Sequence, residues 1–188
     1  ALLGLMALAG LSWLGYGYIL YLALPALPVF AWHLWLVSRR EERRQIGVEI
    51  LGSGVLALAA PAAYWVGLGQ PDPIGWWLWG LTWFQSAASI VYAYLRLEQR
   101  QLPALPFLQE RLRMGRRALL YTSFNFLVVL LLSLLQVLPP WLWLPYAIQW
   151  LETIYGTLNP AIKARPTAIG MRQLMVSILF TITFILAW

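Results

Sequence analysis

The sequence contains no cysteine, and only 11% of its residues are charged, whereas 61% are hydrophobic. Without cysteine the chain has no disulfide, no thiol nucleophile and no Cys-ligated metal. About a quarter of the residues of a soluble domain are charged, so this composition excludes a soluble domain. The dyad alternation of polarity that marks a β-barrel is also absent. The sequence therefore predicts an all-α protein, a polytopic transmembrane helical bundle whose backbone satisfies its own hydrogen bonds.

Sequence motifs for catalysis are missing as well. The chain has no glycine-rich phosphate loop, no His-Glu-x-x-His pair and no nucleophile elbow, which favours a non-enzymatic role. Its one histidine, His33, cannot make a protein-only zinc site. His33 is either an interfacial side chain, which we favour, or an axial ligand of chlorophyll or haem, about 7–8 Å along a helix from the charged segment that begins at Ser38.

The few charges that are present gather in three clusters. The segment Ser38–Gln45 holds four of the thirteen basic residues and two of the seven acids, and no charge precedes it. The other basic residues lie within 96–117 and 163–172. Because positive loops stay on the cytoplasmic side of a membrane, residues 38–46, 98–115 and 159–170 are predicted to be cytoplasmic. Orientation and contact with anionic lipid account for the net charge of +6, and no nucleic-acid partner is expected.

The apolar runs between these clusters predict about seven spans within one domain that covers residues 1–188. We expect the spans at residues 1–16, 18–37, 46–66, 75–97, 116–138, 141–158 and 171–188. Ser38 and Glu41 have the spacing of a capping box for the third helix, and Pro61 is expected to kink that helix. A short surface helix is predicted at 105–112. Because the chain starts inside an apolar run, we expect further residues upstream.

Polar side chains recur at helical spacing in four of the predicted spans. They are Gln45, Glu49 and Ser53; Gln85, Ser89, Tyr92 and Arg96; Arg117, Tyr121 and Asn125; and Gln149, Glu152, Thr153 and Gly156. One interpretation is packing between helices, to which polar and small residues contribute. The other is a shared ligand cavity that opens toward the charged loops, because polar groups inside a membrane often mark function. Its predicted lining is Glu49, Gln85, Arg96, Arg117, Asn125 and Glu152. Arg96 and Arg117 are the expected partners of the two glutamates.

Two stretches of the chain resemble the YwiC-like family of bacterial multi-pass membrane proteins. The first comprises Ser38-Arg39-Arg40-Glu41-Glu42-Arg43, Gly47-Val48-Glu49-Ile50-Leu51-Gly52 and residues 56–64, and the second runs from Lys163-Ala164-Arg165-Pro166 to Ile169-Gly170. The resemblance implies a further N-terminal segment with a His-Gly-Ala-Trp-like motif. It implies no established reaction.

The layout is also distantly similar to that of the UbiA prenyltransferases. That resemblance implies a prenyl or other amphiphilic substrate in a cavity that faces the cytoplasm. Where those enzymes hold magnesium with paired aspartates, this chain has Arg96-Leu97-Glu98-Gln99-Arg100. One glutamate flanked by arginines is a poor substitute for two carboxylates around Mg²⁺, which weakens prenyl transfer as a function.

Two classes of function follow from these observations. The first is a non-catalytic accessory subunit of a membrane complex, associated with lipid, quinone or a tetrapyrrole pigment. The second is a UbiA-like enzyme or carrier that binds an amphiphile. Both classes place the chain in a bacterial cytoplasmic or thylakoid membrane, where its partners are the bilayer and other membrane subunits.

Overall fold

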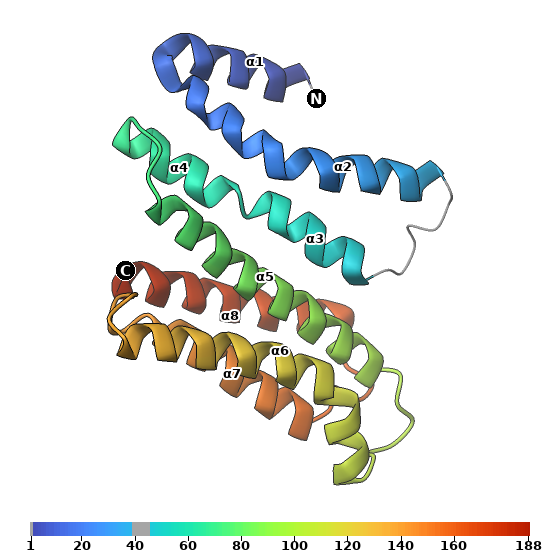
Figure 1. The fold of residues 1–188 in the computed structure, drawn as a ribbon. Coiled ribbons are helices and arrows are strands. Elements are labelled where there is room, and N and C mark those ends of the chain that lie inside the picture. Colours follow the sequence, from blue (N-terminus) through green and yellow to red (C-terminus); the bar gives the residue numbers. More distant parts are fainter. Residues whose placement is uncertain (1, 39–45) are drawn as a thin grey trace. The chain divides into compact units, whose positions relative to one another are not determined.

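The computed structural model describes residues 2–38 and 46–188, and these residues form helices and no strand (Figure 1). Residues 39–45, and with them the capping box expected between Ser38 and Glu41, lie outside the described residues. The chain divides into two compact units, Ala1–Ala87 and Ala88–Trp188, which we call the N-terminal unit and the C-terminal unit. The long helix α5 (Ile74–Gln99) contributes residues to both units.

The N-terminal unit begins with a helical reversal. Helix α1 (Leu2–Leu11) leads into the π-helical turn η1 (Ser12–Tyr16) and the 3₁₀ turn η2 (Gly17–Leu22), and α2 (Ala23–Ser38) follows. Gly15 has a φ of 94° inside the reversal, a conformation that only glycine adopts at little cost. Figure 1 shows α1 and α2 running in opposite directions on either side of it.

A proline interrupts the next helical segment of this unit. Two residues separate α3 (Ile46–Leu56) from α4 (Ala59–Leu68), and Pro61 lies in the first turn of α4. Proline lacks the N–H that would bond the carbonyl four residues earlier, at Ala57, and its ring clashes with that carbonyl. The Ala57 carbonyl instead accepts from the Ala60 N–H at 3.0 Å. The predicted kink is therefore a break into two helices.

Tryptophans join the first half of α5 to α3. The indole N–H of Trp79 donates to the Gly54 carbonyl, and that of Trp83 donates to the Ile50 carbonyl, each at 2.8 Å. The two rings stack with their centroids 5.3 Å apart. A Cβ on Gly54 would lie 2.7 Å from Trp83 Cε2, so glycine is needed for this approach. A Cβ on Gly52, two residues earlier, would meet nothing within 4 Å, so the close approach is at Gly54 alone of the two glycines.

The C-terminal unit comprises the second half of α5 together with α6 (Leu108–Leu134), α7 (Trp143–Leu158) and α8 (Pro166–Ala187). Of the surface helix predicted at 105–112, only residues 108–112 are helical, and they continue into the fifth predicted span as the single helix α6. Helix α6 buries a stripe of mostly small residues: Gly115, Ala118, Thr122, Asn125, Val129 and Ser133. Its large side chains are exposed: Leu120, Phe124, Leu127, Leu131 and Leu134. Small residues inside and large apolar residues outside are typical of membrane helices, since small residues let the backbones approach.

Four segments of the described residues have the length and apolar composition to cross a membrane: Ala9–Trp35, which includes the reversal at Gly15, Gly47–Leu68, Leu108–Leu134 and Pro166–Ala187. The protein is therefore a helical membrane protein. Of the other helices, α5 has 26 residues but many Trp, Ser and Gln, which lower its mean hydropathy. Helix α7 has only 16 residues, and a membrane crossing takes about 20. The count of seven spans stays a prediction.

Candidate functional site

The candidate site lies in the C-terminal unit and is built on one face of α7. Gln149, Glu152, Thr153 and Gly156 share that face at helical spacing. Gln149 and Thr153 are buried, and Gln149 Nε2 donates to Ser89 Oγ of α5 at 2.8 Å. The Thr153 hydroxyl is satisfied within its own helix, by the Gln149 carbonyl at 2.9 Å. The polar face of α7 therefore meets α5.

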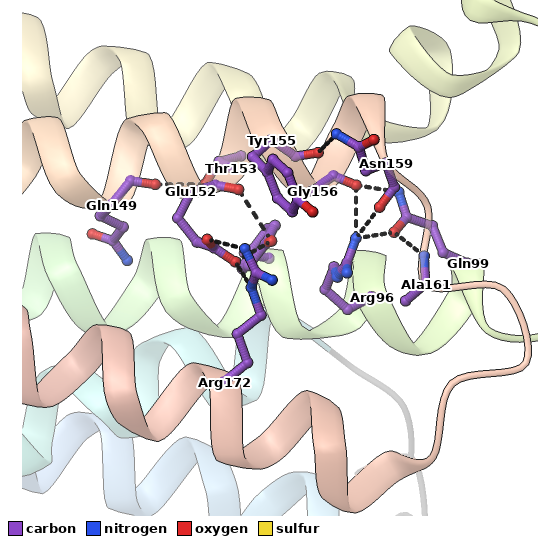
Figure 2. Close-up of polar contacts among 11 residues, drawn as sticks. Arg96, Gln99, Gln149, Glu152, Thr153, Tyr155, Gly156, Asn159, Ala161 and Arg172 are labelled. Atoms are coloured by element: carbon purple, nitrogen blue, oxygen red, sulfur yellow. Dashed lines mark hydrogen bonds and ion pairs between the residues drawn. The ribbon is translucent and has the colours of Figure 1, made fainter.

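Glu152 is the acidic centre of the site. Arg172 of α8 bonds both of its carboxylate oxygens through one edge of the guanidinium, Nε to Oε1 at 2.6 Å and Nη2 to Oε2 at 2.8 Å (Figure 2). The hydroxyl of the buried Tyr92 donates to Glu152 Oε1 at 2.9 Å. The Glu152 side chain is 12% exposed and that of Arg172 is 45% exposed, so the pair lies at the edge of the unit. Glu152 thus joins α5, α7 and α8.

Arg96 has a different environment, at the C-terminal end of α7. Its Nη1 donates to three neutral oxygens: the carbonyls of Gly156 and Asn159, both at 2.8 Å, and Gln99 Oε1 at 2.9 Å. The last carbonyls of a helix have no partner within the helix and carry a partial negative charge, which a cation stabilises. Gln99 supports the same end, because its Nε2 donates to the Gly156 carbonyl at 3.0 Å. Arg96 therefore caps α7.

The charged loops of this unit meet at one end of it. The Lys163 N–H donates to the Arg100 carbonyl at 3.1 Å, and Arg100 Nε donates to the Ala164 carbonyl at 3.3 Å. Arg111 Nη1 also reaches the Leu158 carbonyl at 2.8 Å. The loop after α5 and the loop after α7 are thus bonded to each other, and Asn159, where the second loop begins, accepts from Arg96.

An open pocket of about 540 Å³ lies at this charged end. It is lined by Arg96, Ala161, Ala164, Ala168, Ile169, Met171, Arg172, Gln173 and Met175. Most of its wall is apolar, and its polar side chains are two arginines and a glutamine. A concave, mostly apolar surface with few polar groups is the usual form of a ligand pocket.

The structure brings two of the predicted cavity residues close together and leaves others apart. Arg96 and Glu152 are linked through Tyr92, because the Arg96 guanidinium lies 5.9 Å from the Tyr92 ring centre. Arg117 is exposed on α6, whereas the neighbouring Ala118 is buried against the bundle. Asn125 is buried in the stripe of small residues on α6.

The remaining predicted residues belong to the N-terminal unit. Glu49 is exposed on α3, and Gln85 is half-buried on α5. His33 is exposed on α2. The convergence of Glu49 and Gln85 with the residues of the C-terminal unit stays a prediction. Within the described residues, no group of three or more His, Asp or Glu side chains is placed to hold a metal ion.

Sequence reasoning missed Arg172, the partner of Glu152. A signal was present, because Arg172 is the only charged residue from Pro166 to Trp188 and follows six residues after that proline. A lone charge at that depth of an apolar helix needs a partner. Gln99 was missed for another reason. The sequence places it in the predicted charged loop at 98–115, and only the fold shows that it is buried.

Comparison of the chain with protein-family models, with curated proteins and with solved structures finds no significant match.

Proposed function

We propose that this helical membrane protein is a non-catalytic accessory subunit of a membrane complex, with its polar residues holding the helices together. The observation that carries the proposal is that the ionisable side chains of Glu152 and Arg96 bond helices to each other. Glu152 joins three helices, and Arg96 caps one helix from another. Their bonds fix positions of helices, as expected of groups whose role is structural.

The apolar surface supports a partner inside the membrane. Helix α8 exposes a series of large side chains along its length: Leu174, Met175, Ile178, Leu179, Ile182, Ile185 and Leu186. Lipid covers such a face, and so does a helix of another subunit. We further propose seven spans, cytoplasmic loops at 98–115 and 159–170, and membership of the YwiC-like group in a bacterial membrane.

Purification in a mild detergent tests the proposal. A tagged chain, extracted from its native membrane and separated on a native gel, is expected to migrate with a stoichiometric membrane partner that mass spectrometry identifies. A control extraction in a harsh detergent should release the chain alone. Migration of the chain by itself in the mild detergent would contradict the accessory role.

A second candidate function is an enzyme or carrier that binds an amphiphile. The open pocket beside Arg96 and Arg172 favours it, because a basic group at the end of an apolar wall matches an anionic head and an apolar tail. This candidate predicts that the same mild extract contains a stoichiometric prenyl lipid, quinone or other amphiphile. The first candidate instead predicts a stoichiometric protein partner, whether or not an amphiphile is bound.

A further inference from the structure

We propose that the pocket at the charged end of the C-terminal unit binds the phosphate head group of an anionic membrane lipid, with Arg96 as its principal ligand. The inference goes beyond an accessory role, because it assigns a specific pocket and a specific lipid head group. It rests on the proposed membrane embedding, and it specifies the ligand class of the second candidate function.

Arg96 has N–H donors that no acceptor among the described residues uses. A guanidinium carries five N–H donors, two of them on Nη1. All the hydrogen bonds of Arg96 leave from Nη1 and end on neutral oxygens, so Nε and Nη2 have no acceptor within the described residues. The residue is only 8% exposed and lines the pocket. A buried cation that faces an open pocket without a counter-charge favours an anion there.

The charge balance of the pocket supports the same conclusion. Arg172 also lines it, but Glu152 neutralises that charge. Arg96 has no such carboxylate among the described residues, and the carbonyls at the end of α7 supply only a fraction of a negative charge. The pocket therefore keeps a net positive charge, which an anionic phosphate complements by charge-assisted hydrogen bonds.

The walls of the pocket fit a phosphate group. Three alanines, Ala161, Ala164 and Ala168, leave room in front of the guanidinium. Ala168 and Ile169 belong to the first turn of α8, whose N-terminal end carries partial positive charge. The amide of Gln173, also on the pocket wall, offers a further donor.

The position of the pocket indicates a lipid rather than a free anion. Met171 and Met175 line it and are exposed on α8, and the exposed apolar face of that helix continues from them through Ile178. An acyl chain that leaves the pocket along this face would stay against apolar side chains. The other end of the pocket adjoins the basic loops, which suit the anionic surface of a membrane.

Native mass spectrometry of the delipidated protein in detergent tests the proposal. The protein is titrated with dioleoyl phosphatidylglycerol, with dioleoyl phosphatidylcholine and with inorganic phosphate. We expect phosphatidylglycerol to bind at least about tenfold more tightly than phosphatidylcholine, because the two lipids share the phosphate but the choline cation of phosphatidylcholine is repelled by the positive charge of the pocket. Equal binding of the two lipids would overturn the proposal. Displacement of phosphatidylglycerol by an equal concentration of inorganic phosphate would identify a free-anion site and overturn the lipid assignment.

Two variants and a matched control locate the site. Arg96→Met should abolish the preference for phosphatidylglycerol. Ala168→Trp should abolish it as well by filling the pocket, and it leaves every bond of Arg96 in place, so its result does not depend on the stability of α7. Arg113→Gln removes an exposed arginine of α6 and should keep the preference. Retention of the preference by Ala168→Trp, or an equal loss in Arg113→Gln, would refute the site.

Failure of the membrane embedding would give a different result. If the protein is not embedded, a carbonate wash of the membranes releases it before any lipid is tested. A protein that resists the wash but shows no lipid preference would refute the head-group site alone.

Discussion

At the scale of single residues, Glu152 and Arg96 of the candidate site are stabilised in different ways. Glu152 has a full counter-charge, since Arg172 bonds it through two nitrogens. Arg96 depends on carbonyl oxygens at the end of α7. Breaking a buried pair by removing one partner costs about 3–5 kcal/mol, because the other charge stays behind. The Glu152–Arg172 pair is more exposed than a fully buried ion pair, so removing one of its partners should cost less.

Glycine at position 156 is a second residue-scale requirement. A Cβ there would overlap the hydroxyl and ring of Tyr92, the same hydroxyl that bonds Glu152. We expect Gly156→Ala to lower the free energy of unfolding by about 1–3 kcal/mol, the usual cost of overpacking. Denaturation of the purified protein in detergent, followed by circular dichroism, measures it.

Gly170 of α8 is the matched control. It also lies in a helix, but a Cβ there meets open space. Because alanine favours a helix over glycine, Gly170→Ala should leave stability unchanged or raise it by up to about 1 kcal/mol. Equal destabilisation by both substitutions would show that the contact with Tyr92 does not explain the effect, because helix propensity favours alanine at both positions.

At the scale of elements, the break between α3 and α4 explains how α5 packs in the N-terminal unit. The Leu58 N–H donates to the Val55 carbonyl at 3.1 Å, as in a 3₁₀ turn. The Gly54 carbonyl accepts the indole of Trp79. Next to the break that Pro61 causes, the Gly54 carbonyl thus bonds α3 to α5 through Trp79.

Replacement of the proline should straighten this segment. In Pro61→Ala the restored N–H can donate to the Ala57 carbonyl, so α3 and α4 become one helix. A straight helix from Gly47 to Leu68 has a Cα separation of about 32 Å at 1.5 Å per residue. Spin labels on cysteines introduced at these two positions should approach that separation in pulsed electron resonance. The chain has no native cysteine, so the labels have no background.

Pro71→Ala, in the turn that precedes α5, is the control for this experiment. Pro71 lies outside both helices, so its replacement should leave the label separation as it is in the unsubstituted protein. An unchanged separation in Pro61→Ala as well would mean that the tryptophans, and not the proline, hold the break.

At the scale of the whole molecule, the distribution of charge and apolar surface defines a membrane protein. The described helices expose large apolar side chains, while their buried stripes include glycine, alanine, threonine, asparagine and glutamine. In the C-terminal unit, the basic loops after α5 and α7 are bonded to each other at one end. This arrangement is the one that the positive-inside rule requires of two loops on the same side of a membrane.

Labelling of introduced cysteines tests the orientation. Cysteines at Gln101 and Ala164, in the two basic loops, should be protected from an impermeant thiol reagent in intact cells and should react after the cells are opened. A cysteine at Gln70 should react in intact cells, because an odd number of predicted spans separates it from either loop. The reverse pattern would invert the topology, and protection of all three in intact cells would contradict the predicted span between Gln70 and the basic loops.

The sequence by itself determined that this chain is a helical membrane protein and approximately where its helices lie. Hydropathy, proline and the charged clusters are local signals, because a span is defined by consecutive apolar residues and a break by a missing N–H. Helix α5 was expected at 75–97 and runs from Ile74 to Gln99. Periodicity also identified the polar face of α7, since residues three and four apart lie on one side of a helix.

Only the tertiary structure decided which partners those polar residues have. Arg96 and Arg117 were both available partners for the glutamates in the sequence, yet Arg96 caps α7, Arg117 is exposed on α6, and Arg172 forms the ion pair with Glu152. Helical spacing shows that side chains share a face, but not which neighbouring helix that face meets. That depends on how each helix is rotated about its own axis, which is set by small residues such as Gly115 and Gly156 where the helices touch.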